Sequence, residues 1–153
     1  MAPEKYQLFH YRNNLRNLAE IVNLEQVSFQ SFWSRESLRV EIANPLTLLS
    51  IIKVSSAPEL TGYSLTRIIS PEAELLKLAI RPGARRRGAA TILLDGIFKK
   101  IRSLKVNKIY LEVSEKNQQA IALYQKSGFN TTTRRPHYYD NGTTGALLMT
   151  LSL

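Results

Sequence analysis

The segment "IRPGARRRGAATILL" (residues 80–94) passes from a strand to a helix within a few residues, and it decides how the chain folds. An apolar strand ends in the turn-forming pair Pro82-Gly83, three arginines follow at 85–87, and Gly88 precedes apolar residues at helical spacing. The first N–H groups of such a helix have no intrahelical acceptors, and the helix dipole adds partial positive charge there. Gly88 has no Cβ to keep an anion from this backbone. The segment therefore predicts either a phosphate site at a helix start or a solvated basic turn.

On both sides of this segment, stretches with apolar residues at strand spacing alternate with stretches at helical spacing. They predict strands at residues 6–12, 46–55, 60–70, 73–80, 108–113, 129–139 and 145–153, and helices at 14–29, 34–44, 90–104 and 117–128. Ser34 and Asn117 are candidate N-caps, and Gly128 is a candidate stop signal for the last helix. No linker, repeat or low-complexity segment divides the chain. We therefore expect a single α/β domain over residues 1–153, with a mixed sheet and helices on both faces.

Composition excludes several classes of protein. The 153 residues are 44% hydrophobic and 22% charged, as in an ordinary globular domain, and they include no cysteine. Disulfides, thiolate nucleophiles and cysteine zinc sites are therefore excluded. The N-terminal residues carry charges where a signal peptide needs an apolar block, and the most apolar run, residues 46–52, is far too short to span a membrane. We expect a soluble, cytoplasmic protein with no membrane partner.

The positive charge lies in one half of the chain. Residues 1–76 hold 7 Lys and Arg against 8 Asp and Glu, whereas residues 77–153 hold 14 against 4, a net charge of +10. Such asymmetry predicts an anionic partner, which could be nucleic acid, a phosphorylated cofactor or a ribosomal surface.

Two further side chains are candidates for acid and base chemistry. Glu112 lies on the minority face of the strand at 108–113, and Tyr124 lies 12 residues later on the next helix. Taken singly, Glu112 is typical of a solvent-facing strand residue and Tyr124 of a core aromatic. A short loop joins the two elements, so that both side chains could reach one cleft and serve there as base and acid.

The combination of these segments resembles a known superfamily. "LAIRPGARRRGAA" (residues 78–90), followed after a helix by "LEVSEKNQQAIALYQKSGF" (111–129), is similar to the GNAT superfamily of acetyl-CoA-dependent N-acetyltransferases. The latter segment, with "RRPHYYDNG" (134–142) and "FWSRES" (32–37), resembles its RimI group, the ribosomal-protein-alanine N-acetyltransferases. The resemblance extends over about residues 29–149 and is most specific at 77–129. It implies a seven-stranded sheet splayed between strands 4 and 5, acetyl-CoA in the cleft, and a protein N-terminal α-amine as the acceptor. From its RimI group we expect this to be the N-terminal alanine of a ribosomal protein.

The resemblance also implies roles for individual residues. The backbone of Leu78, Ala79 and Ile80 would hold the acetyl and pantetheine arm, and Asn117 would contact the cofactor. Glu112 would be the general base and Tyr124 the general acid. The pyrophosphate would be held by Arg85, Arg86, Arg87, Gly88, Ala89, Ala90 and Thr91. Chemistry agrees with these roles, because a carboxylate can accept the proton of an ammonium group and a neutral phenol can return one to sulfur.

The acceptor is less well defined by the sequence than the cofactor. Trp33, Tyr138 and Tyr139 could line a peptide groove or be core or rim aromatics. Asp140 stands where the group usually has proline, and Gly145 stands where it usually has an acidic residue. Lysine, polyamine or another small amine therefore remains open as the acceptor, as does a non-catalytic RNA- or ribosome-binding module, although direct nucleic-acid binding is not expected. His10 and His137 are far apart in sequence, and we expect no metal site.

Overall fold

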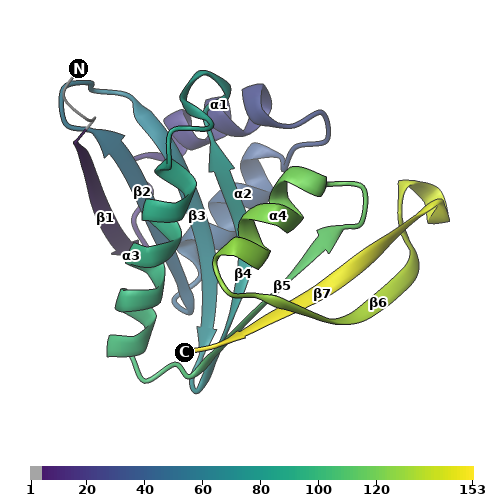
Figure 1. Ribbon diagram of the computed structural model, residues 1–153. Helices are drawn as coiled ribbons and strands as arrows, with labels where there is room; N and C mark the ends of the chain where they lie inside the picture. Colours follow the sequence, from purple (N-terminus) through teal and green to yellow (C-terminus); the bar gives the residue numbers. More distant parts are fainter. Residues whose placement is uncertain (1–4) are drawn as a thin grey trace.

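The computed structural model describes residues 5–153, in which a seven-stranded sheet carries α-helices on both faces (Figure 1). The strands are β1 (Tyr6–Arg12), β2 (Thr47–Val54), β3 (Leu60–Ile69), β4 (Glu72–Ile80), β5 (Lys108–Ser114), β6 (Asn130–Tyr139) and β7 (Thr144–Ser152). The helices are α1 (Leu18–Ser28), α2 (Arg35–Ala43), α3 (Ala89–Ser103) and α4 (Gln118–Lys126). Short 3-10 turns occupy Pro82–Ala84 and Asp140–Gly142.

The sheet opens between two of its central strands. Its order is β1-β2-β3-β4-β5-β7-β6, and neighbouring strands are antiparallel except for the parallel pair β4 and β5. That pair is short, because Glu72 to Glu74 oppose Lys108 to Tyr110 and the register then ends. Beyond Glu74, the two strands diverge toward their C-terminal ends. The predicted seven-stranded mixed sheet with a splay between strands 4 and 5 is thereby confirmed.

Each face of the sheet has its own hydrophobic core. Apolar residues of α3 and α4 pack with the inward-facing residues of β5, which are Ile109, Leu111 and Val113. Residues of α1 and α2 pack on the opposite face, around Tyr63 and Leu65 of β3. In Figure 1, α3 and α4 lie in front of the sheet, and α1 and α2 lie behind it. The predicted arrangement of helices on both faces is confirmed.

Local signals define most of the helix ends. Ser34 Oγ accepts a hydrogen bond from the N–H of Ser37 at 3.1 Å, and Asn117 Oδ1 accepts one from the N–H of Ala120 at 3.2 Å, so both predicted N-caps are confirmed. Gly128 follows α4 with φ +105°, as expected for a helix stop. The first helix begins at Leu18 rather than at residue 14, because the side chain of Asn14 accepts the N–H of Arg16 and holds a turn there.

A bulge shifts the register where β3 meets the middle of β4. Leu65 opposes Lys77, whereas Thr66 opposes Leu75, so Leu76 is an extra residue on β4.

In the described part of the chain, no helix is long and apolar enough to cross a membrane.

Candidate active site

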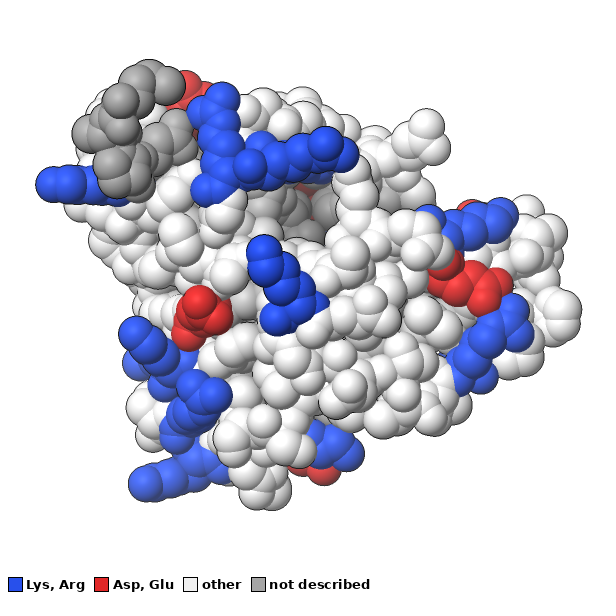
Figure 2. Space-filling view, viewed as in Figure 1, with Lys and Arg blue, Asp and Glu red and all other residues white. Residues whose placement is uncertain are grey.

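A cavity of about 940 Å³ lies between the end of β4, the start of α3 and the length of α4. In Figure 2, the surface is hollowed between the N-terminal end of α3 and α4, and blue side chains follow its upper rim. Eleven of the predicted site residues line this cavity, namely Leu78, Ala79, Ile80, Arg85, Arg86, Gly88, Ala89, Ala90, Thr91, Asn117 and Tyr124. Segments distant in sequence therefore meet around one space.

The start of α3 supplies backbone donors to this cavity. Gly88 is the N-cap residue with φ +85°, and its carbonyl accepts the N–H of Ile92 at 3.0 Å. The N–H groups of Ala89, Ala90 and Thr91 precede that bond, so they have no intrahelical acceptors. A Cβ added to Gly88 would have no heavy atom within 4 Å, which means that this backbone faces open space. An anion can therefore approach the helix start closely.

The three arginines have different surroundings. Arg86 lines the cavity and has φ +63°. Arg85 also lines it, but its guanidinium donates hydrogen bonds to the carbonyl oxygens of Ile80 at 3.0 Å and Ser28 at 3.3 Å. Arg85 thus joins the turn before α3 to the ends of β4 and α1. Arg87 is not among the cavity residues. In this run, Arg85 connects parts of the fold, and Arg86 has a side chain that can bind an anion in the cavity.

The end of β4 lies close against β3 but is open toward β5. A Cβ on Gly62 would stand 2.5 Å from Ile80 Cδ1 and 2.6 Å from the carbonyl oxygen of Ala79, so only glycine admits β4 at this position. On the other edge, the pairing with β5 has already ended at Glu74. The backbone of Leu78, Ala79 and Ile80 therefore faces the opening, where an extended ligand could pair with it.

Tyr124 places a phenol at the wall of the cavity. The residue is 8% exposed, and its ring meets Phe129 edge to face at a centroid distance of 5.6 Å. Burial raises the pKa of Tyr124 to about 12. The phenol is therefore protonated at neutral pH and can donate a proton or a hydrogen bond.

Glu112 lies on the opposite face of β5 from the α3 and α4 core. Its Oε1 is 3.3 Å from a guanidinium nitrogen of Arg135. Its Oε2 is buried and has no hydrogen-bond partner among residues 5–153. Glu112 is not one of the residues that line the cavity, whereas Tyr124 is. The opening between β4 and β5 is the place where groups on the two faces can approach a common ligand.

The predicted tyrosine pair lies beside Glu112 rather than in the cavity. The rings of Tyr138 and Tyr139 are perpendicular, with centroids 4.9 Å apart. The guanidinium carbon of Arg135 is 5.6 Å from the centre of the Tyr138 ring. Burial is the main cause that raises the pKa of Tyr139, and the neighbouring Tyr138 and Glu112 raise it further. Arg135 therefore connects the carboxylate to the aromatic pair.

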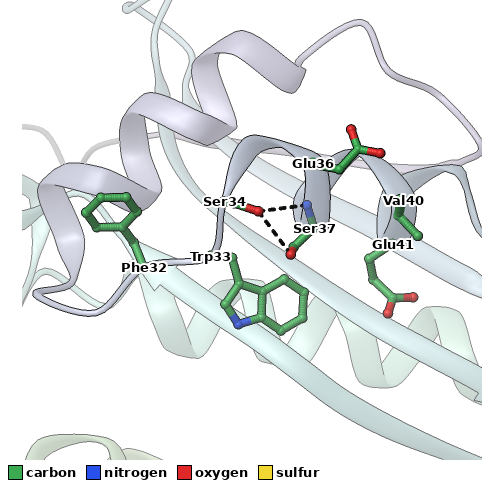
Figure 3. Close-up of a pocket in the computed structure, with 7 residues that line it drawn as sticks. All are labelled: Phe32, Trp33, Ser34, Glu36, Ser37, Val40 and Glu41. Atoms are coloured by element: carbon green, nitrogen blue, oxygen red, sulfur yellow. Dashed lines mark hydrogen bonds between the residues drawn. The ribbon is translucent and has the colours of Figure 1, made fainter.

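Trp33 lines a second cavity, of about 560 Å³, along α2, which we call the α2 groove. Figure 3 shows its indole beside the first turn of α2, where Ser34 caps the helix. Two apolar residues of this groove, Phe32 and Val40, are 48% and 55% exposed. Its lining residues are Phe32, Trp33, Ser34, Glu36, Ser37, Val40 and Glu41. The candidate acceptor residues thus belong to two places, the α2 groove and the β6–β7 hairpin.

The two departures from the RimI pattern have structural roles in the hairpin. The N–H of Gly145 donates to Glu115 at 2.9 Å, and a Cβ there would lie 3.0 Å from a guanidinium nitrogen of Arg134. Glu115 holds Arg134 through two hydrogen bonds of 2.6 and 2.9 Å. Asp140 accepts a hydrogen bond from the hydroxyl of Thr144 at 3.0 Å. Glycine at position 145 therefore makes room for the ion pair between Glu115, which follows β5, and Arg134 of β6.

Sequence reasoning missed several residues of this region. Ser28 and Phe29 line the large cavity from the end of α1, and Arg135 pairs with Glu112. Glu25 and Lys77 form an ion pair behind β4, with 2.9 Å between Oε2 and Nζ. A charged residue within the otherwise apolar run "LLKLAI" was the available signal for Lys77. Residues 5–153 contain no group of three or more His, Cys, Asp or Glu side chains placed to hold a metal ion.

Comparison with known proteins agrees with this geometry. The ribosomal protein bS18-alanine N-acetyltransferase of Salmonella typhimurium (strain LT2) is 32% identical over 104 residues, which are 67% of this chain and 70% of that protein. The crystal structure of the ribosomal-protein-S18-alanine N-acetyltransferase from Escherichia coli has a TM-score of 0.86 at 25% identity and covers 95% of this chain and 94% of its own. Arabidopsis thaliana NAA60 in complex with acetyl-CoA has the same fold, with a TM-score of 0.83 at 18% identity over 96% of this chain and 99% of its own.

The family itself is defined by a match over most of the chain. The model of the acetyltransferase (GNAT) family matches residues 18–129. This range contains all four α-helices and every residue that lines the large cavity. The predicted superfamily and enzyme class are thereby confirmed. This chain belongs to the GNAT family of acetyltransferases and is an acyltransferase.

Proposed function

We propose that the protein transfers the acetyl group of acetyl-CoA to the α-amine at the N-terminus of another protein. The observation that carries this proposal is the large cavity, in which a glycine-led helix start, an arginine and an unpaired strand edge converge. The chemistry of acetyl-CoA matches these three features, because the molecule has a pyrophosphate, a long amide-containing arm and a thioester.

Each part of acetyl-CoA has a counterpart among the cavity residues. The N–H groups of Ala89 to Thr91 and the Arg86 side chain would hold the pyrophosphate. The edge of Leu78 to Ile80 that is not paired with β5 would hydrogen-bond the amides of the pantetheine arm, as a neighbouring strand does. Asn117 would contact the same ligand from the start of α4. Arg87 stays a predicted contact on the strength of the family resemblance alone.

Glu112 and Tyr124 would move the protons. When bound, acetyl-CoA supplies the acetyl group as a thioester, and transfer forms an amide N–C bond while the C–S bond breaks. Glu112 accepts the proton that the acceptor's ammonium group loses, and its Oε2, which has no hydrogen-bond partner among residues 5–153, would take it once the acceptor reaches this oxygen. Tyr124 donates its phenol proton to the departing sulfur, which leaves as a thiol. As the amide forms, its nitrogen loses a second proton, which passes through solvent to the Tyr124 phenolate, and Glu112 releases the first proton to solvent.

An α-amine suits a single carboxylate base better than a lysine does. The α-amine titrates near 7.7–8.0 and lysine near 10.4, so at pH 7 roughly a tenth of N-termini are neutral, against well under a thousandth of lysines. The proton transfer is easier for the N-terminus by about 3–4 kcal/mol.

The names of the relatives narrow the acceptor further. Proteins 25–32% identical to this chain are named for an alanine of ribosomal protein S18. We therefore propose the N-terminal alanine of a ribosomal protein as the acceptor here. Trp33 of the α2 groove and the pair Tyr138 and Tyr139 would line the path of the acceptor chain. We propose that such an enzyme works in the cytoplasm, where ribosomal proteins are made. We also propose that residues 1–153 form one domain.

A mass-spectrometric screen tests the proposed reaction. The protein is incubated with acetyl-CoA and with peptides that begin with alanine or other residues, an N-terminally blocked peptide with an internal lysine, and polyamines. We expect acetylation of free N-termini, with alanine preferred. Equal or faster acetylation of the blocked peptide or a polyamine would contradict the N-terminal acceptor. Activity on other N-termini would remove only the alanine. If the protein acetylates none of these amines, the remaining interpretation is a non-catalytic, basic RNA- or ribosome-binding module.

Two conservative variants test the proton transfers. Glu112→Gln and Tyr124→Phe should each lower kcat by about 10²–10⁴-fold while coenzyme A still binds to Glu112→Gln. Glu59→Gln and Tyr11→Phe change the same groups away from the cavity and serve as matched controls. Wild-type turnover in both Glu112→Gln and Tyr124→Phe would place the chemistry elsewhere.

A further inference from the structure

A buried ion pair lies behind β4, next to the strand residues that face the cavity. Glu25, on the last turn of α1, is fully buried, and the Lys77 side chain is 13% exposed. The Glu25 carboxylate accepts a hydrogen bond from the hydroxyl of Tyr63 at 2.6 Å and one from the N–H of Trp33 at 2.8 Å. Its Oε2 is also 2.9 Å from Lys77 Nζ. Three separate parts of the chain therefore converge on one carboxylate.

The same lysine contacts two aromatic rings of the segment between α1 and α2. Lys77 Nζ is 4.1 Å from the centre of the Phe29 ring and 5.4 Å from that of Trp33. Both distances are within the range of cation–π attraction. The segment is thus held at Phe29 and Trp33 by the ammonium, and at the Trp33 backbone by Glu25. Arg85 holds its beginning through the carbonyl of Ser28.

This segment contributes residues to both the large cavity and the α2 groove. Phe29 lines the large cavity, and Trp33 lines the α2 groove (Figure 3). A buried ion pair contributes little net stability compared with apolar side chains of the same volume, because both charges lose their hydration. Its hydrogen bonds, however, are directional. The charges at this site therefore define where the segment lies more than how stable the protein is.

We propose that Lys77 is a positioning residue for acetyl transfer, which fixes residues 29–33 as the common wall of the coenzyme cavity and the α2 groove. This inference rests on the proposed function, because it assigns the α2 groove to the acceptor. Without the ammonium, Phe29 and Trp33 lose their shared contact, and the wall on the acceptor side is no longer held in one place. Coenzyme binding depends mainly on the start of α3, which Lys77 does not touch, and should change little.

Trp33 is the single tryptophan of the chain, so its fluorescence reports on this segment without any assay of activity. In Lys77→Met, which keeps an unbranched side chain up to Cε but lacks the terminal ammonium group, we expect at least a twofold larger quenching constant for acrylamide. We also expect the KM for an acceptor peptide to rise at least tenfold, while kcat and the Kd of coenzyme A change less than threefold. Lys77→Arg, which keeps the charge, should restore most of the acceptor KM. Lys53→Met on β2 is the matched control and should resemble the wild type.

A second variant separates positioning from folding. Lys77→Met leaves the Glu25 charge buried without its cation and could unfold the protein. Glu25→Gln combined with Lys77→Met removes both charges and keeps an amide oxygen that can accept from the N–H of Trp33 and an amide N–H that can donate to the hydroxyl oxygen of Tyr63. We expect this double variant to fold and still to show the larger quenching and the higher acceptor KM. Wild-type quenching and acceptor KM in it would overturn the inference.

The two proposals can fail separately. Quenching that is equal in the wild type and in folded Lys77 variants overturns the positioning role, whatever the activity. Absence of acetyl transfer in the wild type overturns the proposed function, while the quenching comparison still decides whether Lys77 holds the segment.

Discussion

Two glycines of the turn before α3 permit a direct test of the anion site. Gly83 and Gly88 lie five residues apart, and a Cβ added at either position would have no heavy atom within 4 Å. They differ in conformation, because Gly88 has φ +85° whereas Gly83 lies in a 3-10 turn without a positive φ. They also differ in location, because Gly88 lines the cavity and Gly83 does not. We predict opposite effects of Gly88→Ala and Gly83→Ala.

The magnitudes follow from these differences. An alanine in the left-handed region costs about 1–2 kcal/mol, so Gly88→Ala should lower the free energy of unfolding by that amount, without a steric clash. Gly83→Ala should raise it by about 0.4–1 kcal/mol, because the unfolded chain loses freedom and the native conformation suits alanine. The methyl group of Gly88→Ala would also stand where a phosphate approaches the backbone. We expect its affinity for coenzyme A to fall at least tenfold, which is about 1.4 kcal/mol.

Urea unfolding and titration calorimetry with coenzyme A measure both quantities on the same samples. Coenzyme affinity should be unchanged in Gly83→Ala, which shows that the turn tolerates a methyl group outside the cavity. Unchanged affinity in folded Gly88→Ala would refute the phosphate site at the start of α3. A loss of affinity in both variants would show that the turn, and not the helix start, is responsible.

Three further predictions concern other parts of the structure. Arg86→Ala should weaken coenzyme A binding at least tenfold by calorimetry, whereas Lys99→Ala, which removes the same charge from an exposed position of α3, should leave it within twofold. The hydrogen bond from Arg134 lowers the pKa of Glu115 to about 2, so Glu115 should stabilise the fold above its unfolded pKa near 4.5 and lose this effect as pH falls toward 2; in Glu115→Gln, the urea midpoint should lack that part of its pH dependence. Gly62→Ala should lower the free energy of unfolding by about 1–3 kcal/mol and raise the KM for acetyl-CoA, because its Cβ would push against Ile80 and the backbone of Ala79, and a wild-type melting temperature would contradict this.

The residues proposed to hold the pyrophosphate could be proposed from the sequence because they are close together in it. A helix start after a strand exposes its first N–H groups wherever it occurs, so Gly88 to Thr91 could be read as a phosphate site without the tertiary structure. The alternation of Ile109, Leu111 and Val113 likewise placed Glu112 on the other face of its strand. The N-caps Ser34 and Asn117 depend only on residues three positions away.

The acceptor side was less predictable, because its contacts join distant segments. Arg135 of β6 pairs with Glu112 of β5 across β7, and Lys77 of β4 pairs with Glu25 of α1. Arg85 resembled a phosphate ligand in sequence, yet its guanidinium also joins α1 to β4. Such partners depend on strand register and on the packing of helices against the sheet, which one sequence does not reveal.

The sequence by itself determined the family, the order of the elements and the helix start that faces the cavity, since each of these follows from local spacing and backbone geometry. Only the tertiary structure decided where β4 and β5 part, which helices pack on each face of the sheet, and which charges meet. Glu112 lies on the face of β5 away from the core that contains Tyr124, and the parallel pairing that ends at Glu74 leaves an opening between β4 and β5. That opening exists because the strands twist apart once their hydrogen bonds end, which depends on the packing of the whole sheet.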